Sequence, residues 1–148
     1  MAGTNKKPRR PANNRRGRAP NPERGEHGLT LGGRSYILRP SFEAAAAMEE
    51  ETGRSLMELL RACNSCALPL YDLGVVVAEF IRSGAEENDQ LTRAVTAERI
   101  AQLIYEHGTA TLYPVLVVIL GDAVSGGRTS EGEKKAATAK TEQAGAAG

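Results

Sequence analysis

The residues of this sequence whose side chains are best suited to chemistry are two cysteines, Cys63 and Cys66, spaced as C-x-x-C. That spacing occurs in dithiol redox centres and in half of a zinc site. Zinc needs two further ligands, and the remaining candidates, His27 and His107, have no useful spacing to the pair. A redox dithiol lies at a strand-to-helix junction of an α/β unit, whereas this pair ends a helical stripe. We therefore predict that the cysteines behave as small apolar residues, with neither metal nor cofactor.

An acidic run, Glu49 to Glu51, is the second group that could do chemistry. General acid–base catalysis needs carboxyl groups that converge on one cleft. Neighbouring residues of a helix point in different directions, so a solvated helix face explains this run better. The sequence also contains none of the patterns G-x-x-x-x-G-K, G-x-G-x-x-G or G-x-S-x-G. We therefore predict that the protein is not an enzyme.

Basic residues concentrate in the first 24 positions, which hold eight Lys and Arg against one acid, whereas residues 25–148 hold eleven against seventeen. Such an arm neutralises phosphates without sequence preference, which predicts weak and salt-sensitive nucleic-acid binding. It has no interleaved aromatic residues for base stacking. Two other interpretations stay open, a solvated tail and a loose attraction of the arm to the acidic body. The candidate contacts are Lys6, Lys7, Arg9, Arg10, Arg15, Arg16 and Arg18.

Both ends of the chain, residues 1–24 and 128–148, lack bulky apolar side chains and are predicted to be disordered. This leaves residues 25–127 as one domain, whose core must come from Leu, Ile, Val and Ala because the chain has no Trp and two Phe. The longest apolar run, Leu112 to Leu120, is too short for a membrane helix. The charged N-terminus has no apolar stretch behind it, so we expect no secretory signal and a soluble, cytoplasmic protein.

A β-hairpin is predicted at the start of this domain, around Gly32-Gly33. Two successive glycines favour a two-residue turn, because both can take positive φ. That turn pairs Leu31 with Arg34, and it places four apolar side chains on one face, namely Leu29, Leu31, Tyr36 and Leu38. A two-stranded hairpin is marginal alone. We therefore expect this face to pack on the first and last helices of the domain.

Five helices are predicted after the hairpin, separated by capping residues, glycines and prolines. The predicted fold class is thus mainly α (α+β), an N-terminal hairpin packed on a bundle of about five helices. The first helix follows Ser41 and ends near Thr52, the second opens with the capping box Ser55 to Glu58, the third lies between Pro69 and Gly84, the fourth follows Thr96 and ends before Gly108, and the fifth runs from about Thr111 to Val124.

The fifth helix is apolar on all sides, so it must be covered on more than one side. One interpretation is that it is the central helix of the bundle. The other is that one face contacts another protein, and both can hold together. The residues predicted to face outward and to form this protein-interaction site are Tyr113, Val117, Leu120 and Val124.

The order of these features resembles the small tail-assembly protein of gene transfer agents and related siphophages, of the tail tube or tail-assembly chaperone type. The resemblance covers residues 24–127. It extends through three later helical segments, at residues 73–84, 96–108 and 112–127. Its earlier matching residues are Arg24-Gly25-Glu26, Leu31-Gly32-Gly33-Arg34, Tyr36, Leu38-Arg39, Phe42, Ala45, Glu49, Gly53 and Leu56.

The resemblance implies a non-catalytic role in virion assembly, encoded by a prophage or gene transfer agent. Such a chaperone binds the tape measure protein before tail tube subunits polymerise around it, in the cytoplasm of the bacterial host. One alternative is a structural tail tube component, although tube subunits are built on larger β-sandwiches. A second is a nucleic-acid-binding accessory protein acting through the basic arm. Self-association stays open, and no membrane partner is expected.

Overall fold

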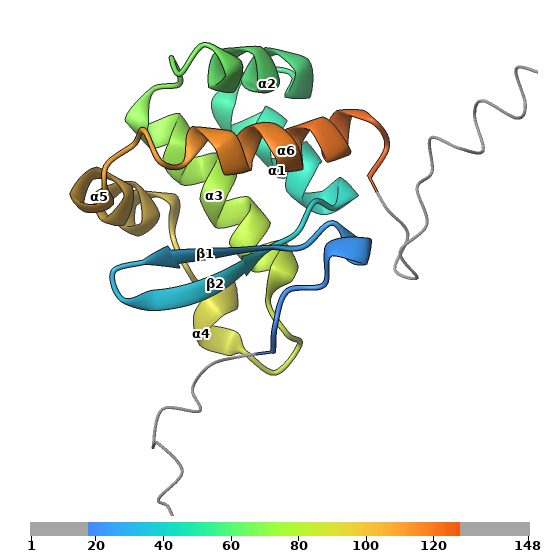
Figure 1. Cartoon of the computed structure of the whole chain (residues 1–148), viewed down its shortest axis with the longest axis vertical. Coiled ribbons are helices and arrows are strands. Elements are labelled where there is room, and N and C mark those ends of the chain that lie inside the picture. The colour runs from blue at the N-terminus through green and yellow to red at the C-terminus, as the bar shows by residue number, and fades with distance from the viewer. Residues whose placement is uncertain (1–17, 128–148) are drawn as a thin grey trace, which may run out of the picture.

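The computed structural model describes residues 18–127, and the elements follow one another with short connections (Figure 1). A 3-10 turn, η1 (Pro22–Arg24), precedes the strands β1 (His27–Leu31) and β2 (Arg34–Leu38). The helices are α1 (Phe42–Thr52), α2 (Leu56–Asn64), α3 (Leu70–Gly84), α4 (Gln90–Arg93), α5 (Ala97–His107) and α6 (Tyr113–Val124). The predicted class, a hairpin on a mainly helical domain, is confirmed.

The hairpin has the predicted register, with Leu31 opposite Arg34 and Leu29 opposite Tyr36. Both turn glycines have positive φ, 58° and 75°, as a two-residue turn requires. Leu31, Tyr36 and Leu38 are buried, and Leu29 packs against the core. The supporting helices differ from those expected. The hairpin packs mainly on α3 and α5, because α3 runs behind β2 and α5 lies beside β1.

The helix boundaries follow local capping chemistry, and the predicted caps are present. Ser41 accepts a hydrogen bond from the Ala44 N–H, and Thr96 accepts one from the Arg99 N–H. Ser55 and Glu58 form the predicted reciprocal capping box. No helix was predicted between Gly84 and Thr96, but the structure has α4 there, and the first turn of α4 is capped by Asp89.

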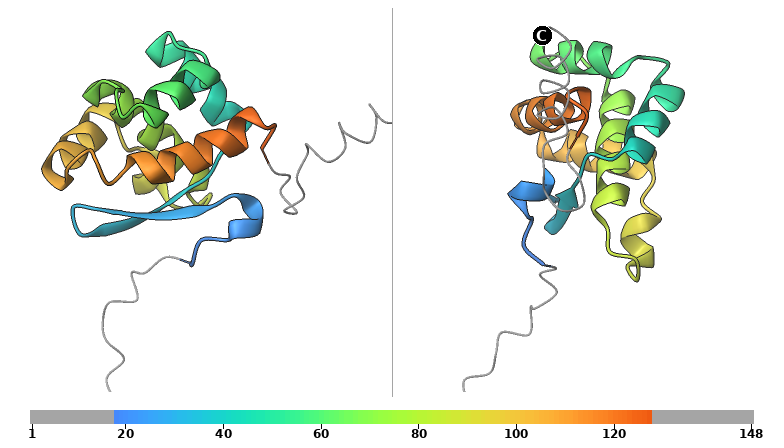
Figure 2. Two further views of the ribbon diagram at one scale, coloured as in Figure 1. Left: turned by 45° about the horizontal axis from the view of Figure 1, so that its top comes forward. Right: turned by 90° about the vertical axis from the view of Figure 1, so that its right-hand side faces the viewer.

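Helix α3, not α6, is the central element of the core. It is buried from Leu73 to Ile81, and it packs against α1, α5 and β2. Figure 1 shows α6, in orange, crossing the front of the molecule with α2 above it and the hairpin below. The right-hand view of Figure 2 places α1 and α6 on opposite sides of α3. Among the described residues, no helix is long and apolar enough to span a bilayer.

Candidate interaction surfaces

The two cysteines lie in different environments at the end of α2. Cys63 is buried in the core and Cys66 is exposed, and both thiols are free. Burial, assisted by the nearby Cys66, raises the pKa of Cys63 to about 11. The Cys63 thiol is therefore protonated at neutral pH and is a poor nucleophile. Within residues 18–127, no three His, Cys, Asp or Glu side chains are grouped so as to hold a metal ion.

The outward orientation predicted for the α6 residues is wrong for two of the four. Tyr113 and Leu120 are buried, and the Tyr113 hydroxyl donates to the Leu68 carbonyl oxygen at 3.3 Å. Val117 and Val124 are half-buried. The reason is that α2 packs on α6 and covers the side that was expected to be free. Val118 is instead the exposed valine of this helix, at 51%. Whether any α6 residue contacts another protein stays a prediction.

Two neighbouring valines of α6 provide a test of this correction. We expect Val117→Glu to lower the free energy of unfolding by about 2 kcal/mol, because Val117 packs against the core and a carboxylate there loses water. The same substitution at the exposed Val118 should change it by less than about 0.5 kcal/mol. Urea denaturation followed by circular dichroism measures both. Equal losses at the two positions would contradict the burial pattern of α6.

A concave surface that the sequence analysis missed lies between the start of α3 and the outer face of α5. Tyr71 and Tyr105 contribute large exposed aromatic rings, with 58% and 75% of each residue accessible. The hollow has a volume of about 430 Å³. We call it the tyrosine groove, and it is lined by Leu70, Tyr71, Glu98, Ala101, Gln102, Tyr105 and Glu106.

The charge of the tyrosine groove has one sign. Its lining contains two carboxylates, from Glu98 and Glu106, and neither lysine nor arginine. The nearest cation in sequence, Arg99, donates to the Gln102 side chain at 3.4 Å. A sequence signal for the groove existed, because Tyr105 follows the apolar stripe of α5 but falls on its polar side. Tyr71 lies on a different helix, so only the fold reveals that the two rings share one hollow.

The Arg-Gly-Glu segment before β1 forms a buried charge cluster. The Glu26 side chain is fully buried, and it accepts two hydrogen bonds from Arg18, at 2.6 and 2.9 Å. The Asn21 N–H donates to the same carboxylate at 2.9 Å, and Arg24 lies 3.6 Å from it. Burial opposes ionisation, but these donors and cations hold the pKa of Glu26 below its ordinary value. Gly25 permits this turn with φ of 73°.

This cluster corrects the prediction for the N-terminal arm. Residues 18–24 were expected to be disordered, but Arg18 and the η1 turn have defined places. The Arg18 guanidinium was a candidate nucleic-acid contact, and in the structure it pairs with Glu26 and, at 3.5 Å, with Glu86. The charge of Arg18 is therefore paired with carboxylates of the protein itself. The other candidate contacts lie outside the described residues: Lys6, Lys7, Arg9, Arg10, Arg15 and Arg16.

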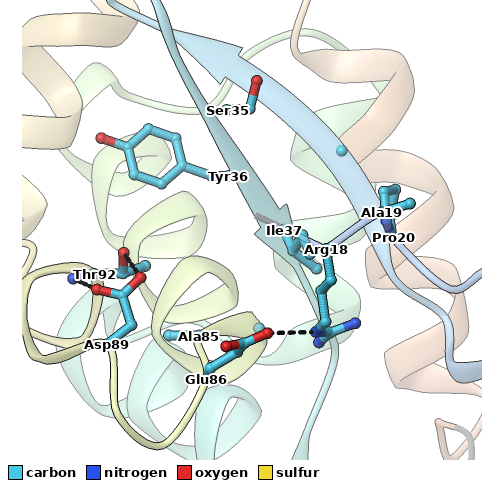
Figure 3. A pocket seen from close by; sticks show the side chains of 12 residues that line it. Arg18, Ala19, Pro20, Ser35, Tyr36, Ile37, Ala85, Glu86, Asp89 and Thr92 are labelled. Carbon is cyan, nitrogen blue, oxygen red and sulfur yellow. Dashed lines mark hydrogen bonds and ion pairs between the residues drawn. The ribbon is translucent and has the colours of Figure 1, made fainter. Parts of the chain in front are cut away.

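A second hollow lies beside β2, where the N-terminal segment meets the loop between α3 and α4 (Figure 3). Its volume is about 410 Å³. Tyr36, Ile37 and Ala85 supply apolar surface, and Figure 3 shows Glu86 reaching toward Arg18 across one end. We call it the hairpin cleft. Its lining residues are Arg18, Ala19, Pro20, Gly28, Ser35, Tyr36, Ile37, Gly84, Ala85, Glu86, Asp89 and Thr92.

The fold defines a class of protein, a small hairpin-and-helix domain, with open hollows that include the tyrosine groove and the hairpin cleft. Comparison with known families gives the particular assignment. The family described as "Phage tail tube protein, GTA-gp10" matches residues 24–126, and the chain belongs to this family. It is therefore a protein of phage or gene transfer agent tails, whose partners are other tail proteins. No curated protein and no solved structure matches the chain.

Proposed function

We propose that this protein is a non-catalytic tail assembly chaperone, which binds the tape measure protein in the bacterial cytoplasm before tail tube subunits assemble around it. The observation that carries the proposal is the tyrosine groove. Tyr71 and Tyr105 expose large aromatic surface beside the half-exposed Leu70. A concave group of exposed apolar side chains marks a site for another macromolecule more often than isolated exposed residues do.

The groove has the chemistry to bind an apolar helix. An amphipathic helix places its apolar face in such a groove and anchors it through residues spaced three and four apart. Tyrosine rings supply large contact areas and a hydroxyl at the rim, which makes them frequent hot spots. The carboxylates of Glu98 and Glu106 favour a partner helix with basic residues beside its apolar face. Binding of this kind is reversible, as an assembly factor requires.

A second candidate function is a structural component of the tail tube, and the description of the matching family favours it. The small amount of β-structure favours the chaperone. Residues 18–127 contain a single two-stranded sheet, whereas tube subunits are built on larger β-sandwiches. The two functions differ in the fate of the protein. A chaperone is absent from purified particles, whereas a tube component is present in many copies. Quantitative mass spectrometry of purified particles separates them.

The tyrosine groove is tested by Tyr105→Ala. We expect this change to weaken binding of the purified tape measure protein about 30-fold, corresponding to a hot-spot loss of about 2 kcal/mol. Stability should change by less than about 0.5 kcal/mol, because the ring is mostly exposed. Isothermal titration calorimetry measures the affinity. Leu91→Ala is the matched control, since Leu91 is equally exposed at 76% but lies on α4, outside the groove.

The binding measurements test the location of the binding site and the chaperone function separately. Equal weakening by Tyr105→Ala and Leu91→Ala would show that the groove is not the binding site. If the unaltered protein has no affinity for the tape measure protein, the chaperone function itself is wrong.

A further inference from the structure

The first residues that the structure describes line the hairpin cleft. Arg18, Ala19 and Pro20 form one wall, so the N-terminal arm enters the structure at the cleft itself. The opposite wall is the loop after α3, which supplies Glu86 and Asp89. Between the walls lie Tyr36 and Ile37 of β2. A segment that fills this space needs apolar groups for the middle and cations for the rim.

The arm of the same chain has that composition. Residues 1–17 contain six basic residues and no acidic one. The dipeptide Pro11-Ala12 is apolar, and it stands between the cationic pairs Arg9-Arg10 and Arg15-Arg16. We propose that residues 9–16 of the N-terminal arm bind in the hairpin cleft of their own chain, with the arginines directed to the acidic α3–α4 loop.

The first arginine of the described chain already makes such a contact. The Arg18 Nε lies 3.5 Å from Glu86 Oε1, and the Glu86 side chain remains half-exposed. Glu87, the next residue, is exposed. Two cations also face this loop, because Arg34 donates to Thr92 and Arg93 donates to the Glu86 carbonyl oxygen. Neither pairs with the carboxylate of Glu86 or Glu87, so Glu87 and the half-exposed Glu86, whose Oε1 contacts Arg18, can receive further cations from the arm.

Tethering makes a weak contact effective. Arg16 is two residues from Arg18 and Pro11 is seven, and an extended chain spans about 3.3–3.6 Å per residue. The arm therefore reaches across a cleft whose wall it continues. A short tether gives an effective concentration in the millimolar range, so millimolar intrinsic affinity suffices for substantial occupancy.

Occupancy by the arm would also cover the part of β2 that lines the cleft. Both strands of a two-stranded sheet are edge strands, and the cleft is lined by Ser35, Tyr36 and Ile37 of β2. Open edges invite pairing with other chains. Proline has no N–H to continue a ladder, so a segment that contains Pro11 covers the edge without extending the sheet. In a protein handled together with other tail proteins, the arm then limits non-specific pairing at this edge.

The test uses the full-length protein and nuclear magnetic resonance of its backbone amides. The variant R9Q/R10Q/R15Q/R16Q removes four charges from the arm. The control R128Q/K134Q/K135Q/K140Q removes four charges from the other end of the sequence. At about 0.01 M salt, the arm variant should shift the amide signals of Ser35, Ile37 and Ala85, and the control should leave them in place. Raising the salt to about 1 M shortens the Debye length from ~30 Å to ~3 Å and should move the unaltered protein toward the spectrum of the arm variant.

A second variant tests the opposite side of the contact. E86Q/E87Q should reproduce the shifts of Ser35 and Ile37 seen in the arm variant. Unchanged signals in the arm variant at low salt would overturn the proposal. Shifts that depend on protein concentration would also overturn it, because they would mean that the arm of another copy occupies the cleft. The proposal does not depend on the proposed function, and no tail protein enters the experiment.

Discussion

Gly84→Ala is expected to lower the free energy of unfolding by about 3 kcal/mol, with a fall in Tm of roughly 10–15 °C. Gly84 is the last residue of α3, and a methyl group at this position would lie 2.0 Å from the Ile37 carbonyl oxygen. That oxygen belongs to the backbone of β2 and cannot move aside without displacing the hairpin from α3. Thermal unfolding followed by circular dichroism measures the effect.

Gly121 provides the matched control, because it is also a helical glycine and a methyl group there has no atom within 4 Å. Gly121→Ala should raise stability by about 0.5–1 kcal/mol through helix propensity alone. A Gly84→Ala protein that melts within about 2 °C of the unaltered chain would contradict the close approach of α3 to β2. The two substitutions are expected to change stability in opposite directions. This difference separates the packing constraint at Gly84 from the general preference of helices for alanine over glycine.

Glu26→Gln is expected to lower the free energy of unfolding at pH 7 by about 2 kcal/mol. The change removes the buried charge that pairs with Arg18 and Arg24, and it replaces a carboxylate oxygen by an amide group that donates. The cost lies below the ~3–5 kcal/mol of a broken, fully buried pair, because both arginine side chains are about one-third exposed and regain water. Urea denaturation at pH 7 measures it. Glu50→Gln, at an exposed position of α1, carries the same charge change and should have little effect.

The contribution of Glu26 should disappear in acid. Its pKa in the folded protein lies below the unfolded value, which is about 4.3 for glutamate. The stabilisation is therefore complete above the unfolded pKa and is lost as the pH falls through the folded pKa. The difference in stability between the unaltered protein and Glu26→Gln should be constant from about pH 7 to pH 5 and shrink below about pH 4. A difference that stays constant in acid would show that the carboxylate is not the stabilising species.

The Glu26 cluster also explains why Arg-Gly-Glu stands before the first strand. Glu26 anchors the chain, Arg24 adds a second cation, and Gly25 takes the left-handed conformation between them. The cluster holds residues 18–20 against the hairpin, where they form a wall of the cleft. The Arg-Gly-Glu motif therefore stabilises the segment before β1. The family match, which begins at residue 24, includes this motif.

Local chemistry made much of the fold predictable. The hairpin register follows from two glycines that take positive φ, because turn length sets which residues pair. The starts of three helices follow from Ser41, Ser55 and Thr96, whose side chains accept hydrogen bonds from N–H groups three residues later. Each of these features depends on residues close together in the sequence, so no knowledge of the tertiary packing is needed.

Long-range packing decided the rest. Helix α6 is apolar on all sides, so its sequence contains no indication of which face α2 would cover, and Tyr113 and Leu120 became core. Gly84 was predicted to end the third helix, and it is the last residue of α3, but only the tertiary structure shows that it also lets the Ile37 carbonyl oxygen approach closely. The partner of Glu26 could not be chosen among eight basic residues in the first 24. In the tyrosine groove, two rings 34 positions apart become neighbours only because α3 and α5 pack together. The sequence determines local features such as turns and helix caps directly. Surfaces shared by distant elements form only when the packed core has set the distance between those elements.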